Sequence, residues 1–309
     1  MRQILPAPGG DALGPALGPA LGPANPLRMA GQVEPGMAGT PEIDRLVAAL
    51  AAAYAYPDRP WVRANMIASV DGAASVQGQS GGLSGAADRM LFWVLRSLAD
   101  VILVGAGTAR AERYGQVRPE QVWARLRVGR PAVPPIAVVT RRLDLPLDGR
   151  LFSGGPERTI VLTTTAAPAA ARAAAAQVAD VIVAGERDVT PGAALDALAG
   201  RGYRAVLAEG GPGLLADLAA ADLLDELCLT ISPVIEGGHA GRILAAPLGP
   251  PAPSGMDAPP GPTGPDAHAG PDAHAGPNAH AGPTATSLRL AALFEDDGFL
   301  LARYLRAPR

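Results

Sequence analysis

The chain has 309 residues, among them 38 Gly, 32 Pro and a single Cys, and its formal net charge is −3. All 26 basic residues are Arg, which excludes Schiff-base and P-loop lysine chemistry. One cysteine excludes an internal disulfide and a cysteine zinc cluster. The small net charge and an aromatic content of 4% argue against a nucleic-acid partner. Because no apolar run suits a membrane span or a signal peptide, we expect a cytoplasmic protein without a membrane partner.

Glycine and proline concentrate in two tracts, residues 1–41 and 247–283, which hold 16 and 18 of them. The first tract repeats Ala-Leu-Gly-Pro, and the second repeats a hexapeptide such as DAHAGP. Proline at every fourth or sixth residue is incompatible with helices and sheet ladders, so we expect both tracts to be disordered, except for the end of the first. The histidines of the second tract could bind a metal, but a flexible linker is the favoured interpretation. We therefore expect an N-terminal arm and one domain over 42–309, with the second tract inserted as a surface loop.

Helices and strands are predicted to alternate along the rest of the chain. Thr40 and Pro41 mark a helix start, and Ser84 is expected to cap a later helix. In chain order we expect a helix 40–55, strand 61–69, helix 84–99, strands 101–104, 135–139 and 159–163, helix 166–178, strand 181–184, helix 191–199, strand 204–208, a helix to 221, and strands 227–232 and 299–305. This alternation predicts an α/β fold with helices on both faces of a sheet.

Two glycine-rich turns follow predicted strands, at 105–107 and at 209–213. Ligands of open α/β sheets bind at the carboxyl ends of strands, where a glycine turn lets a phosphate approach backbone N–H groups. Each turn alone is equally consistent with a plain tight turn, but the two together favour a phosphate or dinucleotide ligand. The Rossmann fingerprint is not met, because Arg110 occupies the position of its third glycine.

A polar Asn65 interrupts the predicted strand 61–69, which ends in the dipeptide Asp71-Gly72. Asp-Gly is a common hairpin turn, so this pattern by itself leaves a structural interpretation open. The alternative is that the carboxylate belongs to a site at the same sheet edge as the glycine turns.

Three segments together resemble the reductase domain of riboflavin biosynthesis: ANMIASVDG (64–72), LSGAADRMLFWVLRSLADVILVGAGTARAE (83–112), and the segment from LAEGG to IEGG (207–238). The resemblance spans about residues 60–246 and the last strand. It implies a dihydrofolate-reductase-like fold, in which helices cover both faces of a mixed, mostly parallel sheet. It also implies a homodimer and NADPH-dependent reduction of 5-amino-6-(5-phosphoribosylamino)uracil, or a close relative, at the ribosyl C1′.

The resemblance also implies roles for individual residues. The NADPH contacts would be Ile67, Gly82, Gly105, Gly107, Thr108, Glu112, Thr140, Arg141, Gly210, Gly211, Pro212, Gly213, Leu214 and Leu215. The substrate contacts would be Ser80, Arg96, Arg118 and Glu209. Asn65, Asp71 and Glu209 are the expected catalytic residues, which would orient the substrate or supply a proton.

Several alternatives remain open at these positions. Arg141 or Arg142 could bind a 2′-phosphate bidentately, or both could be exposed surface residues. Arg96 could bind the sugar phosphate, or it could pair with Asp100 four residues along its helix. Among whole functions, a dihydrofolate or pterin reductase, a non-catalytic NADPH-binding protein and a purely structural domain are the rivals. The zinc-deaminase signature of the bifunctional relatives is absent from the sequence.

Overall fold

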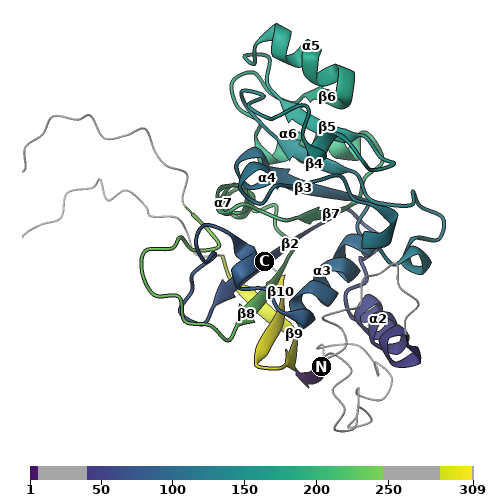
Figure 1. Ribbon diagram of the computed structural model, residues 1–309, viewed down its shortest axis with the longest axis vertical. Coiled ribbons are helices and arrows are strands. Elements are labelled where there is room, and N and C mark those ends of the chain that lie inside the picture. The colour runs from purple at the N-terminus through teal and green to yellow at the C-terminus, as the bar shows by residue number, and fades with distance from the viewer. Residues whose placement is uncertain (6–39, 246–285, 308–309) are drawn as a thin grey trace, which may run out of the picture.

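A single large sheet dominates the computed structural model, which describes residues 1–5, 40–245 and 286–307. In that part of the chain the sheet has ten strands in the order β1-β9-β10-β8-β2-β7-β3-β4-β5-β6 (Figure 1). The strands are β1 (Arg2–Leu5), β2 (Trp61–Ser69), β3 (Val101–Gly105), β4 (Ile136–Val139), β5 (Thr159–Thr163), β6 (Ala179–Val183), β7 (Ala205–Ala208), β8 (Glu226–Ser232), β9 (Leu288–Asp296) and β10 (Phe299–Arg306). Neighbours from β8 to β6 run parallel, whereas β1, β9 and β10 pair antiparallel. The expected mixed, mostly parallel sheet is confirmed.

Helices cover both faces of this sheet. They are α2 (Pro41–Ala53), α3 (Ala86–Leu98), α4 (Ala106–Ala111), α5 (Ala169–Val178), α6 (Pro191–Ala199) and α7 (Pro212–Ala220). One hydrophobic cluster joins buried residues of α2 and α3 to one sheet face, and a second joins α6 and α7 to the other. The central strands are apolar throughout because they are buried on both faces; all five residues of β5 are buried, for example.

The helix starts agree with the sequence prediction at α2 and differ at α3 and α5. Thr40 caps α2, since its side chain accepts a hydrogen bond from the Ile43 N–H. Ser84 does not cap α3: the capping position is Gly85, and the Ser84 hydroxyl donates to Asp88 instead, at 2.6 Å. Helix α5 begins at Ala169 rather than 166, because Pro168 disfavours a helical conformation in the residue before it.

Two strands were not predicted from the sequence. Residues 1–5 lie in the tract expected to be disordered, yet β1 pairs with β9 and places Arg2 opposite Glu295. Strand β9 forms a hairpin with β10 through Asp297 and Gly298, both with positive φ (51° and 83°). This Asp-Gly turn is the sequence signal that would have revealed β9. Residues 6–39 of the first tract, and the second tract with its histidines, lie outside the described residues.

The carboxyl ends of β2, β7 and β3 are adjacent, because these strands are parallel neighbours in that order. Parallel strands bring the turns that follow them to one edge of the sheet. This edge carries both glycine turns, and the candidate site is there. No helix in the described part of the chain has the length and apolarity needed to cross a membrane.

Candidate active site

The two predicted glycine turns lie against each other at the ends of β3 and β7. The Gly105 N–H donates to the Gly210 carbonyl at 2.8 Å. Gly210 has a φ of +81°, and the Gly210–Gly211 peptide is cis. A Cβ on Gly211 would overlap the Thr108 hydroxyl, so a side chain at this position would disrupt the contact between the two turns. The close approach of two backbones explains why glycine is needed here.

A cavity of about 480 Å³, here called the first cavity, opens beside these turns. Its lining includes residues from β2, the loop after it, α3, α4 and the start of α7. The predicted site residues that line it are Asn65, Ile67, Ser80, Gly107, Thr108, Glu112, Glu209, Gly211 and Pro212. Glu112 also fixes the loop before α3, since its carboxylate accepts a hydrogen bond from the Ser80 N–H at 2.8 Å. Predicted site residues from four separate segments of the sequence are therefore brought together.

A second cavity of about 930 Å³ adjoins the first, and Gly107 lines both. The predicted cofactor residues in its lining are Gly105, Gly107, Thr140, Arg141, Gly213 and Leu214. Arg141 is exposed and pairs with Asp188 at 3.1 Å. Arg142 also lines this cavity, and the described residues offer it no ion-pair partner. The two cavities together suit an extended ligand whose middle lies at the glycine turns.

Other predicted residues line neither cavity: Asp71, Gly82, Arg96, Arg118, Gly210 and Leu215. Gly210 and Leu215 lie behind the lining, where a Cβ on Gly210 would meet the Met66 sulfur at 3.2 Å and Leu215 is buried. Arg118 lies outside and pairs with Glu120 at 3.3 Å.

Arg96 forms a buried ion pair with Glu209 from the end of β7. Its Nε and one terminal nitrogen each lie 2.7 Å from a carboxylate oxygen. The expected alternative, a helix salt bridge to Asp100, is wrong: Asp100 instead pairs with Arg130 at 3.5 Å. Tyr114 completes the group, because its hydroxyl donates to Glu209 at 2.7 Å. Such charge-assisted hydrogen bonds hold Glu209 rigidly at the cavity wall.

The surroundings of Tyr114 and Asp88 determine which protons these side chains carry. Burial, and then the negative charge of Glu209, raise the pKa of Tyr114 well above its usual value, so the phenol stays neutral at pH 7. Asp88 lines the first cavity, and burial raises the pKa of its carboxyl, although the Ser84 hydroxyl opposes this effect. Asp88 carries no sequence signal of a functional residue, because an acidic residue in the first turn of a helix is ordinary there.

Asp71 has a different environment. Its carboxylate accepts hydrogen bonds from the Ser69 hydroxyl at 2.5 Å and from the N–H groups of Glu236 and Gly237. These donors, the Ser69 hydroxyl first, lower the pKa of Asp71 to about 2. The carboxylate is therefore ionised at neutral pH and links the end of β2 to the segment that follows β8.

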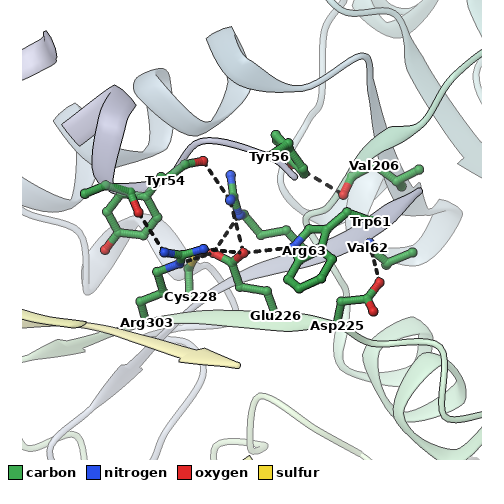
Figure 2. Close-up of polar contacts among 11 residues, drawn as sticks. Tyr54, Tyr56, Trp61, Val62, Arg63, Val206, Asp225, Glu226, Cys228 and Arg303 are labelled. Carbon is green, nitrogen blue, oxygen red and sulfur yellow. Dashed lines mark hydrogen bonds and ion pairs between the residues drawn. The ribbon is translucent and has the colours of Figure 1, made fainter. Parts of the chain in front are cut away.

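A separate polar cluster lies between the sheet and α2, and none of its residues lines either cavity (Figure 2). Arg63 of β2 and Arg303 of β10 each lie 2.8 Å from the Glu226 carboxylate of β8. Both guanidinium groups also donate to carbonyls at the end of α2, those of Tyr54 and Ala53. Burial alone would raise the pKa of Glu226, but the two arginines lower it to about 2. This cluster connects three strands and a helix.

The sheet, the paired glycine turns and the two adjoining cavities define the class: an α/β protein whose cleft lies at the carboxyl edge of its sheet. Comparison with known proteins defines the group within that class. The family model "RibD C-terminal domain" matches residues 60–256. The chain belongs to this family, as its sequence predicted.

Individual relatives of the chain are consistent with this family assignment. A 2,5-diamino-6-ribosylamino-4(3H)-pyrimidinone 5′-phosphate reductase of Archaeoglobus fulgidus is 32% identical over 59% of this chain and 84% of the relative. The same-named protein of Methanothermobacter thermautotrophicus is 29% identical over 60% of this chain and 83% of the relative. The crystal structure of a pyrimidine reductase-like protein from Corynebacterium diphtheriae superposes with a TM-score of 0.66 at 25% identity and covers 84% of this chain and 99% of that one. The expected dihydrofolate-reductase-like fold and reductase class are confirmed, and reductases of this family use a nicotinamide cofactor.

Proposed function

We propose that this chain reduces a phosphoribosylaminopyrimidine at the ribosyl C1′ with NADPH. The observation that carries the proposal is the two-part cleft, whose halves meet at Gly107 between the glycine turns. The named relatives favour the 2,5-diaminopyrimidinone form of the substrate over the uracil form. We also propose the cytoplasmic location and the homodimer that the sequence analysis anticipated.

The second cavity fits the phosphate-bearing end of NADPH. Arg110, Arg141 and Arg142 all line it, and arginine binds phosphate oxygens bidentately. Arg141 is already paired with Asp188, so Arg142 is the better candidate for a 2′-phosphate. The turn at Gly211, where no side chain fits, allows a close backbone approach to a pyrophosphate. When bound, the nicotinamide supplies a hydride.

The first cavity then holds the pyrimidine and its ribose. Glu209 is held by Arg96 and Tyr114, and its carboxylate accepts hydrogen bonds from donors of the pyrimidine ring. Asn65 and Ser80 supply further polar groups in the lining. Both are short side chains on backbone fixed by the sheet and by Glu112, so they orient the substrate with little loss of conformational freedom.

Reduction at C1′ opens the sugar ring, so the ring oxygen needs a proton. Asp71 is a poor source, because its pKa of about 2 leaves it ionised. Asp88 is better suited, since burial raises the pKa of its carboxyl and the side chain reaches the cavity wall. We propose that Asp88 donates this proton, with Ser84 as its hydrogen-bond partner.

The proposal is tested by following NADPH absorbance with three candidate substrates: the diaminopyrimidinone phosphate, the aminouracil phosphate and dihydrofolate. We expect oxidation with a pyrimidine phosphate and none with dihydrofolate. Turnover of dihydrofolate alone would establish the pterin reductase instead. Binding of NADPH without turnover of any of the three would establish the non-catalytic alternative.

A further inference from the structure

Two arginines of the first cavity have no role in the function described so far. Arg89 comes from α3 and Arg242 from the segment 233–245 that follows β8, and both line the cavity. Both side chains are exposed, and neither has a hydrogen bond or ion pair to its guanidinium within the described parts of the chain. Arg96, the residue considered for the sugar phosphate, is instead paired with Glu209, and Arg118, the other arginine expected at the substrate, lies outside the cavity. Unpaired guanidinium groups at a cavity wall are available to an anionic ligand without breaking an existing ion pair.

The segment that carries Arg242 is held in place at several points along its length. Near its start, Val70 donates to the Val234 carbonyl at 3.0 Å. Asp71 then accepts from the N–H groups of Glu236, at 3.2 Å, and of Gly237, at 2.8 Å. Next to Arg242 itself, the Ala74 N–H donates to the Gly241 carbonyl at 2.8 Å.

The far end of this segment contacts the glycine turn at 209–213. The Ala245 N–H donates to the carbonyl of Pro212, the first residue of α7, at 3.2 Å. Gly237 and Gly238 adopt φ values of +68° and +62°, so the segment turns sharply just after its contact with Asp71. The segment therefore spans from the end of β2 to the start of α7, and Asp71 fixes its turn.

We infer that Arg89 and Arg242 together bind the phosphate of the substrate, and that Asp71 is a positioning residue that holds the Arg242 segment against the cavity. This inference rests on the proposed function and adds to it the phosphate-binding residues. Two guanidinium groups from separate elements match the charge of a phosphate monoester and offer it several N–H donors. Holding this segment through backbone N–H groups is a role that suits Asp71, an ionised carboxylate outside the cavity.

The test is steady-state kinetics at saturating NADPH with the pyrimidine ribosyl phosphate and with the same compound after removal of its phosphate. Arg89→Gln and Arg242→Gln should each raise KM for the phosphorylated substrate by about ten-fold to a hundred-fold, the usual effect of losing a charge-assisted hydrogen bond. We expect KM for the dephosphorylated compound to stay near the wild-type value in both variants. We expect kcat to stay near the wild-type value in Arg242→Gln only, because the charge of Arg89 lowers the pKa of Asp88, the proposed proton donor. Arg45→Gln is the matched control, because Arg45 is an exposed arginine of α2 that lines neither cavity.

Asp71→Asn tests the positioning role separately. It should raise KM for the phosphorylated substrate only, and it should add little to the effect of Arg242→Gln in the double variant, because both changes act through one contact. Additive effects of Asp71→Asn and Arg242→Gln would overturn the positioning role. A loss of kcat with both substrates in Asp71→Asn would also overturn it, since that result is expected of a catalytic residue.

The phosphate-binding inference fails if Arg89→Gln and Arg242→Gln leave KM unchanged, or if they raise it equally for both substrates. A wild-type protein that turns over neither pyrimidine would instead refute the proposed function. In that case titration with ribose 5-phosphate, followed by thermal shift, decides the inference. Binding that is lost in the two variants and kept in Arg45→Gln supports a phosphate site, and equal binding by all four proteins overturns it.

Discussion

Replacement of Glu226 by Gln is the sharpest test of how the sheet is held together. Glu226 and Arg63 are completely buried, and the Arg303 side chain is 13% exposed. The pKa of Glu226 falls from 4.5 to about 2, which corresponds to about 3 kcal/mol of stabilisation of the ionised carboxylate. Removal of one partner from a buried pair typically costs about 3–5 kcal/mol, because the other charge is left uncompensated. Glu226→Gln leaves two such charges, so we expect a loss of at least about 3 kcal/mol.

Urea unfolding followed by circular dichroism measures this loss directly. Glu295→Gln is the matched control: its partner Arg2 lies 3.4 Å away and is 75% exposed, so its removal should cost about 1 kcal/mol or less. The pH dependence gives a second measure. Because the folded-state pKa of Glu226 is depressed, its contribution is present above the unfolded-state pKa and is lost as pH falls toward 2. If Glu226→Gln unfolds within 1 kcal/mol of the wild type, or if it retains the acid dependence of the wild type, the reasoning about this cluster is refuted.

Three further predictions concern the cleft. Gly211→Ala should abolish NADPH binding measured by fluorescence titration, since the added Cβ overlaps the Thr108 hydroxyl, whereas Gly192→Ala, with open space around its Cβ, should bind normally. Arg142→Gln should raise KM for NADPH about ten-fold and leave KM for NADH unchanged, because only NADPH carries the 2′-phosphate; equal changes for both would contradict the assignment. With wild-type enzyme, kcat should fall as pH rises through the elevated pKa of Asp88, and Asp88→Asn should lose this pH dependence together with most of kcat.

The sequence predicted the parts of the site that depend on local pattern. Glycine turns after buried strands and a polar residue near a strand end are local signals, and Gly105, Gly211 and Asn65 all reach the expected sheet edge. Once these strands are neighbours in a parallel sheet, the turns that follow them lie at the same sheet edge. The family resemblance supplied the roles of these residues, which no periodicity alone would give.

The parts that could not be predicted depend on contacts between distant segments. Helix spacing made Asp100 a possible partner of Arg96, because the two residues are four positions apart. In the structure Arg96 pairs with Glu209, 113 positions away, and this contact depends on the tertiary fold. The side chain of Arg63 occupies a strand that appears apolar from the sequence, and its burial is explained only by Glu226 on the neighbouring strand. Arg242 lies in an unremarkable loop, and only the hydrogen bonds from that loop to other elements place it at the cavity.

One measurement tests the central claim most directly: NADPH oxidation by the purified 309-residue chain with 2,5-diamino-6-ribosylamino-4(3H)-pyrimidinone 5′-phosphate, with the product identified by mass spectrometry. We predict NADPH consumption that depends on this substrate and a product heavier than the substrate by two hydrogens, with a ribityl chain in place of the ribose ring. Saturable binding of NADPH, without consumption on addition of this phosphate or its uracil counterpart, would contradict the account.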